Sequence, residues 1–277
     1  MQDKKVWFIT GASKGLGLSL VKKLLNEGYR VAATSRNKNK LTEAVAVDSN
    51  LFMPLEVDLS DDQSIGEAIK TTINTFGEIN VVVNNAGYGI GGTIEELSSE
   101  EIMKSFDVNV FAAFKVIKSV MPYLRSPLSG HIINISSIAG FAAATGWSVY
   151  AATKFAVVGF SEVLADDVKE FGIHVTVVEP GAFRTNFLNE ASLTIAKHPI
   201  EDYTSVRATH AKYLSMDGIQ LGDPDKAATV FIKIAESPNP PVRLFMGSDA
   251  YERAVQKVEI LQNDLTNWKE VSALTDF

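Results

Sequence analysis

Short runs of apolar residues alternate along this chain with longer segments in which apolar residues recur at helical spacing. The short runs carry apolar residues on both faces, which is typical of strands that helices cover on both sides. They span residues 5–10, 29–35, 51–58, 79–85, 131–137, 173–180 and 242–247. The helical segments between them span residues 16–28, 65–77, 100–124, 149–172 and 225–237. This alternation predicts an α/β protein with a doubly wound parallel sheet of about seven strands and helices on both faces.

Two segments depart from the alternation. Residues 182–222 mix aromatic and polar positions, and the pattern predicts no strand in them. A long segment after the carboxyl end of a strand is often functional, so we predict a substrate lid at about 182–222, with a surface insertion as the alternative. From about residue 248 an amphipathic helix is expected, packed on the domain or on a partner subunit. No repeat or linker interrupts the chain, so residues 1–277 are predicted to form a single domain.

Composition excludes several kinds of site. The chain has no cysteine, which removes disulfides, thiolate catalysis and cysteine-bound zinc, and its four histidines include no closely spaced pair, so we expect no metal site. The net charge of −7 disfavours a nucleic-acid partner, which would need a basic surface. No apolar stretch approaches the length of a membrane span, and the N-terminal apolar run is too short for a secretion signal. These features favour a cytoplasmic protein without a membrane partner.

The glycine-rich stretch TGASKGLG, residues 10–17, follows the first strand and opens the first helix. Glycines permit a tight turn and a close approach of the backbone to a pyrophosphate, and the helix N-terminus offers N–H groups and the positive end of its dipole. Glycines occur in many turns, but this strand–turn–helix context is typical of the dinucleotide site of a Rossmann fold. The cofactor contacts predicted here are Gly11, Ser13, Lys14, Gly15, Leu16 and Gly17.

The second strand ends without the acidic residue that binds the ribose 2′-hydroxyl in NAD-dependent proteins. Arg36 stands there instead, and Lys14 in the glycine turn is a second cation that could reach a 2′-phosphate. Each alone reads as an ordinary surface base, but together with the missing acid they favour NADP(H) over NAD(H). After the third strand, Asp58, followed by Leu59, could bind the adenine amino group or belong instead to the first turn of a helix.

Three motifs occur in a fixed order: the glycine turn, Asn-Asn-Ala-Gly at 84–87, and Tyr-x-x-x-Lys at 150–154. With them the sequence resembles the classical short-chain dehydrogenase/reductase family over nearly the whole chain, and in particular the branch similar to 17β-hydroxysteroid dehydrogenases. The resemblance implies an oxidoreductase whose catalytic residues are Asn109, Ser137, Tyr150 and Lys154. Ser137, not Ser136, has the family's spacing, and neighbours in a strand face opposite ways. Further cofactor contacts that the resemblance implies are Asn85, Ala86, Gly87, Pro180, Gly181, Phe183 and Thr185.

Tyr150 and Lys154 are one helical turn apart and share a face of the predicted helix. A tyrosine with the ordinary pKa of about 10 is a poor base at neutral pH, and lowering that pKa to about 7 takes roughly 4 kcal/mol. A lysine charge about 4 Å away supplies roughly that energy at an effective dielectric of about 20. The pair is therefore spaced for a tuned proton donor, with an ordinary solvated helix face as the alternative.

The predicted reaction interconverts a carbonyl and an alcohol. Ser137 polarises the carbonyl oxygen, Tyr150 gives it a proton as NADPH gives the hydride, and Lys154, a water and Asn109 relay the replacement proton. The apolar residues that flank the motifs suggest a hydrophobic small-molecule substrate, although each could equally belong to the core: Tyr88, Ile90, Phe141, Trp147 and Phe187. A steroid is suggested by the resemblance alone.

Two other functions stay open at this point. One is a protein that senses NADP(H) without useful turnover, and the other is an NAD-dependent dehydrogenase. The family commonly forms dimers or tetramers through helices that correspond to residues 100–124 and 149–172, so the resemblance also implies a homodimer or homotetramer.

Overall fold

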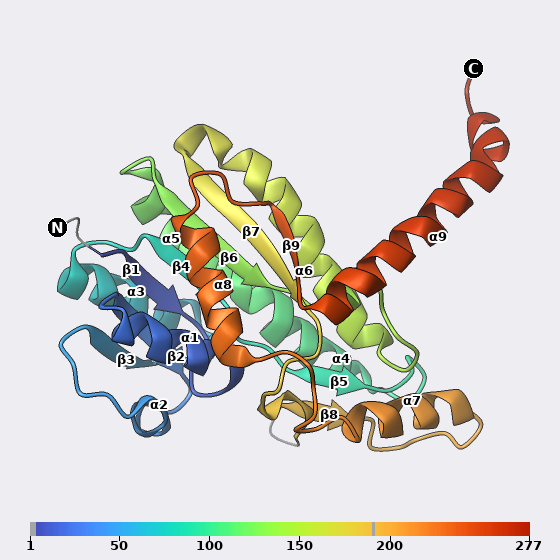
Figure 1. Cartoon of the computed structure of the whole chain (residues 1–277), viewed down its shortest axis with the longest axis horizontal. Coiled ribbons are helices and arrows are strands. Elements are labelled where there is room, and N and C mark those ends of the chain that lie inside the picture. The colour runs from blue at the N-terminus through green and yellow to red at the C-terminus, as the bar shows by residue number, and fades with distance from the viewer. Residues whose placement is uncertain (1–3, 190–191) are drawn as a thin grey trace.

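All seven apolar runs form strands, and each pairs in parallel with its neighbours. The computed structural model describes residues 4–189 and 192–277. The strand order β3-β2-β1-β4-β6-β7-β9 reverses the direction of winding between β1 and β4 (Figure 1), which confirms the predicted doubly wound Rossmann fold. The strands are β1 (Val6–Ile9), β2 (Arg30–Ser35), β3 (Phe52–Glu56), β4 (Val81–Asn84), β6 (Gly130–Ile135), β7 (Ile173–Pro180) and β9 (Arg243–Met246).

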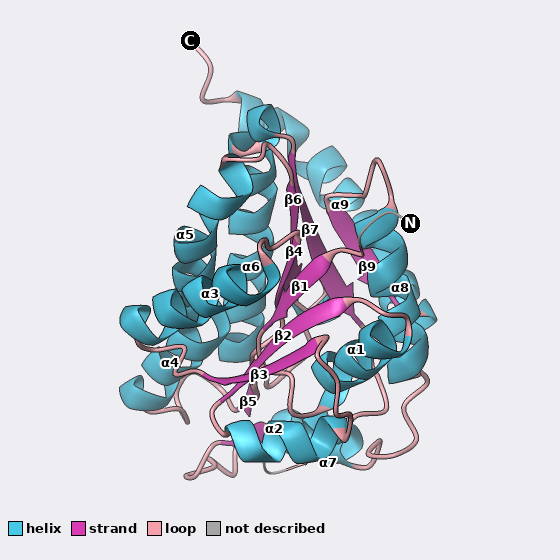
Figure 2. Ribbon diagram, turned by 90° about the vertical axis from the view of Figure 1, so that its left-hand side faces the viewer, coloured by secondary structure: helices cyan, strands magenta, loops and turns pink. Residues whose placement is uncertain are grey.

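Helices cover both faces of the sheet (Figure 2). They are α1 (Gly15–Asn26) and α8 (Pro224–Glu236) on one face, and α3 (Asp62–Phe76), α5 (Ala112–Arg125) and α6 (Ser148–Asp167) on the other. In β1, Trp7 and Ile9 are buried beneath the first pair, whereas Phe8 between them is buried beneath the second group. Successive side chains of a strand point to opposite faces, so a strand covered by helices on both sides needs apolar residues on both faces. Each large side chain buried in this way contributes about 1.5–3 kcal/mol.

The helical segment predicted over 100–124 is two helices joined by a wide turn. α4 (Ser99–Phe106) begins at a capping box, in which Ser98 Oγ accepts from the N–H of Glu101 and the Glu101 carboxylate accepts from the N–H of Ser98. Asp107–Phe111 then form a π-helical turn before α5 continues. Turns of this kind are rare and often mark functional positions, and this one contains Asn109.

Several short elements do not show in the sequence pattern. α2 (Lys38–Val45) begins at Asn37, whose side chain accepts a hydrogen bond from the N–H of Lys40. β5 (Gly89–Gly91) and β8 (Leu193–Ile195) form a separate two-stranded parallel sheet, so the prediction that residues 182–222 contain no strand is wrong. A three-residue strand is too short to show a period, and the partner that stabilises it is distant in sequence. The remaining short elements are α7 (Thr204–Leu214) and the 3₁₀ turns Ile138–Gly140, Lys169–Phe171 and Asn186–Leu188.

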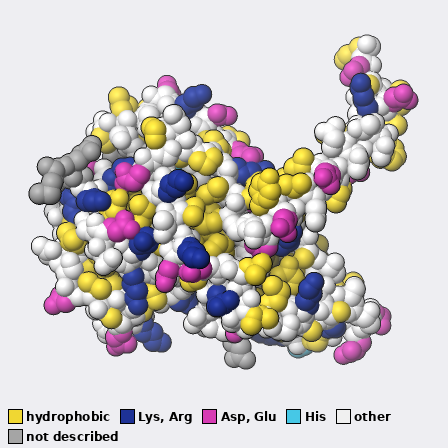
Figure 3. Space-filling model, viewed as in Figure 1, with side chains coloured by type: hydrophobic (Ala, Val, Ile, Leu, Met, Phe, Trp, Pro, Cys, Tyr) yellow, Lys and Arg dark blue, Asp and Glu magenta, His cyan; other side chains and the backbone are white. Residues whose placement is uncertain are grey.

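The two longest helices have different surroundings. α6 is long and apolar enough to cross a membrane by length and composition alone, with a mean hydropathy of 1.2, although the sequence suggested no such stretch. Half of the 18-residue apolar stretch of α6 is buried, and the helix packs against β7. In this fold α6 is therefore a core helix. α9 (Ser248–Ala273) leaves the domain after β9 and projects from it as an arm (Figures 1 and 3).

Candidate active site

The carboxyl ends of all seven strands meet at one edge of the main sheet. At this edge the chain leaves β1 and β4 toward opposite faces, and the crevice that results is where doubly wound sheets bind ligands. The glycine turn follows β1, the Asn-Asn-Ala-Gly motif follows β4, and the serine pair follows β6. The fold thus brings the sequence motifs to one place.

Asn85 holds the glycine turn in shape. Its Nδ2 donates to the carbonyl oxygens of Thr10 (2.9 Å) and Gly11 (3.0 Å). In return, Thr10 Oγ1 accepts from the N–H groups of Asn85 (3.0 Å) and Ala86 (3.1 Å). Gly11 has a φ of +65°, and a Cβ on it would lie 2.7 Å from the Ala86 Cα, so only glycine fits there. Asn85 therefore supports the turn from behind.

The N-terminus of α1 is suited to an anion. Its N-cap is Lys14, whose side chain makes no capping hydrogen bond, and its first turn has no acidic residue. The first N–H groups of a helix have no partner within the helix, and the helix dipole is positive there. Gly15 has a φ of +58° and lies against Thr185, so the segment after β7 approaches the same turn. These features fit the pyrophosphate of a dinucleotide.

Two cations mark the outer end of this crevice. Burial lowers the pKa of Lys14, and the positive charge of Arg36 lowers it further, so the two side chains are near enough to repel each other. Arg36 is exposed at the end of β2. Asp58 is also exposed, and its Oδ1 accepts from the N–H (2.8 Å) and the hydroxyl (2.7 Å) of Ser60, which lower the pKa of the carboxyl. Asp58 thus stabilises the turn before α3, and its Oδ2 accepts neither of these two hydrogen bonds.

The carboxyl end of β6 and the start of α6 bring together Ser137, Tyr150 and Lys154. The Ser137 side chain lies near enough to Tyr150 to lower the pKa of its phenol, and Lys154 Nζ lies 5.8 Å from the centre of the Tyr150 ring. Lys154 Nζ donates to the Ile135 carbonyl (3.0 Å). Ser136 faces away, as the alternation predicts: it is buried and its Oγ donates to the Lys154 carbonyl (2.8 Å).

The electrostatics of the pair differ from the expectation. Burial raises the pKa of Tyr150 to about 12, and the contact with Ser137 offsets only part of that rise. Burial also lowers the pKa of Lys154 to about 8. The expected depression of the tyrosine pKa is therefore wrong for the protein alone, because desolvation of the buried phenol outweighs a lysine charge at this separation. At neutral pH Tyr150 keeps its proton.

Asn109 is fixed by the π-helical turn. Its Oδ1 accepts from the N–H of Tyr88 (3.0 Å), and its Nδ2 donates to the Tyr88 carbonyl (3.0 Å) and to Thr153 Oγ1 (3.2 Å). Gly87 lies between this amide and Lys154: a Cβ on it would be 3.1 Å from Asn109 Oδ1 and 3.5 Å from Lys154 Nζ. The glycine therefore keeps open the small space between the two polar side chains.

β7 ends at Pro180, and the segment after it, which contains Gly181, Phe183 and Thr185, is held by the C-terminal part of the chain. The N–H of Gly181 donates to the Met246 carbonyl at the end of β9 (2.9 Å). The N–H of Ala182 donates to Asp249 Oδ2 in the first turn of α9 (2.7 Å), and the same carboxylate packs directly on Gly181. No motif in the sequence indicates this role of Asp249.

We expect the Asp249→Ala variant to raise the KM for the nicotinamide cofactor about tenfold while kcat changes little. A hydrogen bond to a charged group contributes about 1.5–3 kcal/mol, and its loss frees the segment that Asp249 holds. Steady-state kinetics with varied cofactor measure this. Glu252→Ala, an exposed residue one position past the first turn of α9, is the matched control and leaves KM unchanged. Equal KM values for the two variants would show that Asp249 has no positioning role.

Apolar side chains surround the Tyr150 ring, which lies 5.9 Å from the Phe187 ring and 6.4 Å from that of Trp147. Four of the five residues suggested for the pocket belong to this cluster: Tyr88, Ile90, Trp147 and Phe187. Phe141 does not, because the 3₁₀ turn after Ser137 carries it to the other side, where it packs on Phe245 (5.2 Å) near the start of α9.

The described parts of the 182–222 segment, residues 182–189 and 192–222, cover this cluster. The Trp147 ring contacts those of His210 (5.0 Å) and Tyr213 (5.4 Å). The segment is fastened by Glu96, whose buried carboxylate accepts from the N–H of Ile200 (2.8 Å) and pairs with Arg207 (2.6 Å). Although burial opposes it, these bonds and those from Thr93 lower the pKa of Glu96 to about 2. Glu96 and Arg207 carry no motif, and they lie so far apart in sequence that only the fold reveals their pairing.

Among residues 4–189 and 192–277, no three metal-binding side chains cluster into a metal site. A dinucleotide-binding crevice beside a tyrosine–lysine pair defines a dehydrogenase or reductase built on a Rossmann fold.

Comparison with known proteins agrees. The profile of the short chain dehydrogenase family matches residues 5–195. Oxidoreductase BOA17 of Botryotinia fuckeliana (strain B05.10) is 36% identical over 270 residues, 97% of this chain and 98% of that protein. The 3-ketodihydrosphingosine reductase of Bacteroides thetaiotaomicron is 34% identical over 88% of each chain. The crystal structure of a short-chain dehydrogenase from Streptomyces avermitilis superposes with a TM-score of 0.91 at 33% identity and covers all of both chains. This chain therefore belongs to the short chain dehydrogenase family and is an oxidoreductase; the finer placement near 17β-hydroxysteroid dehydrogenases stays a prediction.

Proposed function

We propose that this protein is an NADP(H)-dependent reductase of hydrophobic ketones or aldehydes, with Tyr150 as the proton donor. The observation that carries the proposal is the position of the Tyr150 hydroxyl. The hydroxyl lies beside Ser137, Lys154 Nζ lies 5.8 Å from the centre of the tyrosine ring, and an apolar cluster encloses the ring. The name of the relative from Bacteroides thetaiotaomicron, a ketone reductase, supports a carbonyl substrate.

The reaction divides among the chain's own residues as follows. The reduced nicotinamide, when bound, supplies the hydride. The Ser137 hydroxyl donates a hydrogen bond to the substrate oxygen and thereby polarises the carbonyl. Tyr150 transfers its phenolic proton to that oxygen, and the charged Lys154 stabilises the developing tyrosinate. Asn109 and Lys154 face the space beside Gly87, where a water can pass a replacement proton toward Tyr150.

NADP(H) is proposed as the cofactor because of the charges at its outer end. A 2′-phosphate would meet the paired cations Lys14 and Arg36, whose mutual repulsion it would relieve. The glycine turn and the uncapped N-terminus of α1 would hold the pyrophosphate. NAD(H) carries no 2′-phosphate for these cations to bind, and β2 ends without the acid that would bind its ribose 2′-hydroxyl.

The pKa of Lys154 sets the expected pH dependence. Lys154 is charged below about pH 8 and neutral above it. Only the charged form stabilises a tyrosinate, so we expect kcat/KM for reduction to be level below pH 8 and to fall above it by up to about tenfold per pH unit. Lys154→Arg stays protonated throughout this range, so its profile is expected to be flat although its rate is lower. A wild-type profile that stays level well above pH 8 would contradict this role of Lys154.

We also propose that residues 182–222 act as a lid. They cover Trp147 and Tyr150, which are nearly buried, so a substrate can enter only if they move. Arg207→Ala leaves the buried Glu96 carboxylate unpaired, which favours the open state. We expect the KM for the carbonyl substrate to rise at least about tenfold with little change in the KM for the cofactor. The control is Lys212→Ala, which changes an exposed residue on the same helix. An equal effect of both variants would show that the Glu96–Arg207 ion pair does not hold the lid closed.

A homodimer or homotetramer is proposed through α5 and α6. α5 exposes Phe114 and α6 exposes Phe155 and Val163, and the ring of Phe111 in the turn before α5 lies 6.2 Å from that of Phe114. Exposed apolar side chains on these two helices favour burial against a second subunit. A cytoplasmic location and the absence of nucleic-acid and membrane partners stay predictions.

The experiment that tests the proposed function measures the oxidation of NADPH against a panel of hydrophobic ketones and aldehydes, with NADH in parallel. We expect turnover with a preference for NADPH, and the best substrate then defines the pocket. Tight binding of NADPH, seen by fluorescence, with no turnover on the whole panel would contradict the reductase and favour a sensor.

A further inference from the structure

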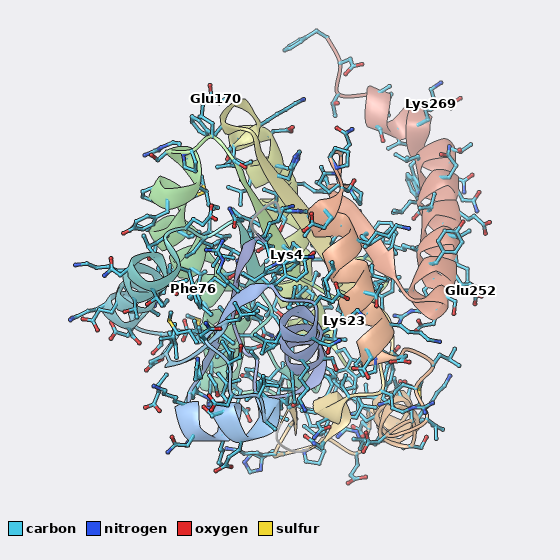
Figure 4. The ribbon with its side chains drawn as sticks, turned by 60° about the vertical axis from the view of Figure 1, so that its left-hand side comes forward. Lys4, Lys23, Phe76, Glu170, Glu252 and Lys269 are labelled. Atoms are coloured by element: carbon cyan, nitrogen blue, oxygen red, sulfur yellow. The ribbon has the colours of Figure 1, made fainter. Side chains whose placement is uncertain are left out.

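The arm formed by α9 carries an apolar stripe that its own domain covers only at the root. Ala250 and Ala254 are buried against the domain, and Arg253 donates a hydrogen bond to the Ala142 carbonyl. Beyond this root the helix continues for about five turns without a neighbour in the described chain. Figure 4 labels Glu252 near the root and Lys269 near the far end, well clear of the sheet and its helices.

The stripe has the spacing of a coiled coil. After Ala250 and Ala254 it continues at intervals of four, three, four and three residues. Its exposed members are Val258 (54% exposed), Leu261 (39%), Leu265 (70%) and Trp268 (62%), and Tyr251 (64%) lies three residues before Ala254 in the same series. A helix that only needed to be soluble would not repeat large apolar residues along one side, so the stripe indicates a helical partner.

We propose that α9 pairs with α9 of a second copy of this chain, in the antiparallel direction. In one antiparallel register the exposed apolar residues meet across the pair: Val258 of one copy meets Leu261 of the other, and Tyr251 of one meets Trp268 of the other. Leu265 then lies beside the root of the other arm, where Ala254 is covered by its own domain. By the twofold symmetry each of these contacts occurs twice. The same register brings Lys257 beside Asp264 of the other copy, so the flanking charges are opposite.

The charges of the chain favour a second copy of α9 over a membrane as the partner. They also favour an antiparallel pair of helices over a parallel pair. α9 contains five acidic and three basic residues, so it would be repelled by an anionic lipid surface. The whole chain has a net charge of −7. A parallel pair would place two such domains side by side at the same end, whereas an antiparallel pair separates them to opposite ends. The root of the arm also bears Asp249, so the pairing would brace the helix that holds the cofactor segment.

Light scattering of the full chain tests the pairing. We expect Leu261→Asp combined with Leu265→Asp to halve the particle mass, from a tetramer held by the α9 pair and by α5 and α6 to a dimer held by α5 and α6 alone. Both positions are exposed, so the circular dichroism spectrum and melting temperature should not change. The control places the same two charges on the opposite side of α9, Asn263→Asp with Asn267→Asp, and keeps the wild-type mass. An unchanged mass in the first variant, or a wild type that is already monomeric, would overturn the proposal.

Cross-linking tests the register, since the chain has no cysteine of its own. We expect Tyr251→Cys and Trp268→Cys proteins of different tag length to form a mixed disulfide when combined and oxidised, and neither to cross-link with itself. In the proposed register identical positions are about 25 Å apart along the helix, from the rise of 1.5 Å per residue. Self-cross-linking of each protein without the mixed product would show a parallel pair. Binding of the wild type, but not of the double aspartate variant, to phosphatidylcholine vesicles without any mixed disulfide would show a membrane arm; both results contradict the proposal.

Discussion

Replacing Tyr150 with phenylalanine is expected to reduce kcat for carbonyl reduction by about 10²–10⁴-fold, the range that positioned acid catalysts contribute. The substitution removes the proton donor and keeps the ring, so the contacts with Phe187 and Trp147 remain. The Kd for NADPH, measured by fluorescence titration, should change by no more than about twofold. Loss of turnover with intact binding would separate the chemical role of the hydroxyl from a structural one.

Tyr213→Phe is the matched control for this variant. Tyr213 also contacts Trp147 and lies in the same apolar cluster, but no motif assigns it chemistry. It should keep turnover within about threefold of the wild type, because only packing is altered and the ring is conserved. Full turnover by Tyr150→Phe would contradict the mechanism, whatever the control shows.

Replacing Arg36 with aspartate is expected to lower the ratio of kcat/KM for NADPH to that for NADH by at least about 100-fold. A charge-assisted hydrogen bond contributes about 1.5–3 kcal/mol, and the new carboxylate would in addition repel a 2′-phosphate. An acid at the end of this strand is also the group that binds the free 2′-hydroxyl of NAD(H). The two coenzymes can be compared in the same assay at saturating carbonyl substrate.

The control for the coenzyme experiment is Lys22→Asp. Lys22 is exposed on α1, away from the end of β2, and its replacement by aspartate changes the charge by the same amount as Arg36→Asp. It should leave the preference for NADPH unchanged, because exposed charges separated by more than the Debye length of about 10 Å are largely screened. If Arg36→Asp also left the preference unchanged, the proposed 2′-phosphate site would be wrong.

The main sheet and the positions of the motifs could be predicted from the sequence because both depend on local patterns. Residues 81–83, for example, are all valine, and the glycine turn and the Tyr-x-x-x-Lys pair are each one short continuous stretch. The resemblance to the family, through its spacing, favoured Ser137 over Ser136, and the alternation of a strand implied that only one of the two could face the substrate. The structure places Ser136 facing away from Tyr150.

Other parts of the site depend on contacts between distant segments, which no local pattern encodes. Asp249 follows the last strand, where an acid near a helix start reads as an ordinary first-turn residue, and only the folded chain brings it to Ala182. The π-helical turn at Asn109 differs from a regular helix by one residue, too little to disturb the apolar spacing. The pKa of Tyr150 was misjudged for the same reason. Spacing gives the distance to a lysine, but burial depends on Phe187 and Trp147, which the whole fold supplies.

In the proposed reaction, hydride from the nicotinamide reaches a carbonyl carbon beside Tyr150. The most direct measurement uses NADPH deuterated at C4 of the nicotinamide, on the face from which hydride is transferred, with the best carbonyl substrate from the panel. Mass spectrometry of the alcohol product should show one deuterium at the carbinol carbon with the wild type, and almost no labelled alcohol with Tyr150→Phe. An alcohol without the label, or equal labelling by both proteins, would contradict the account.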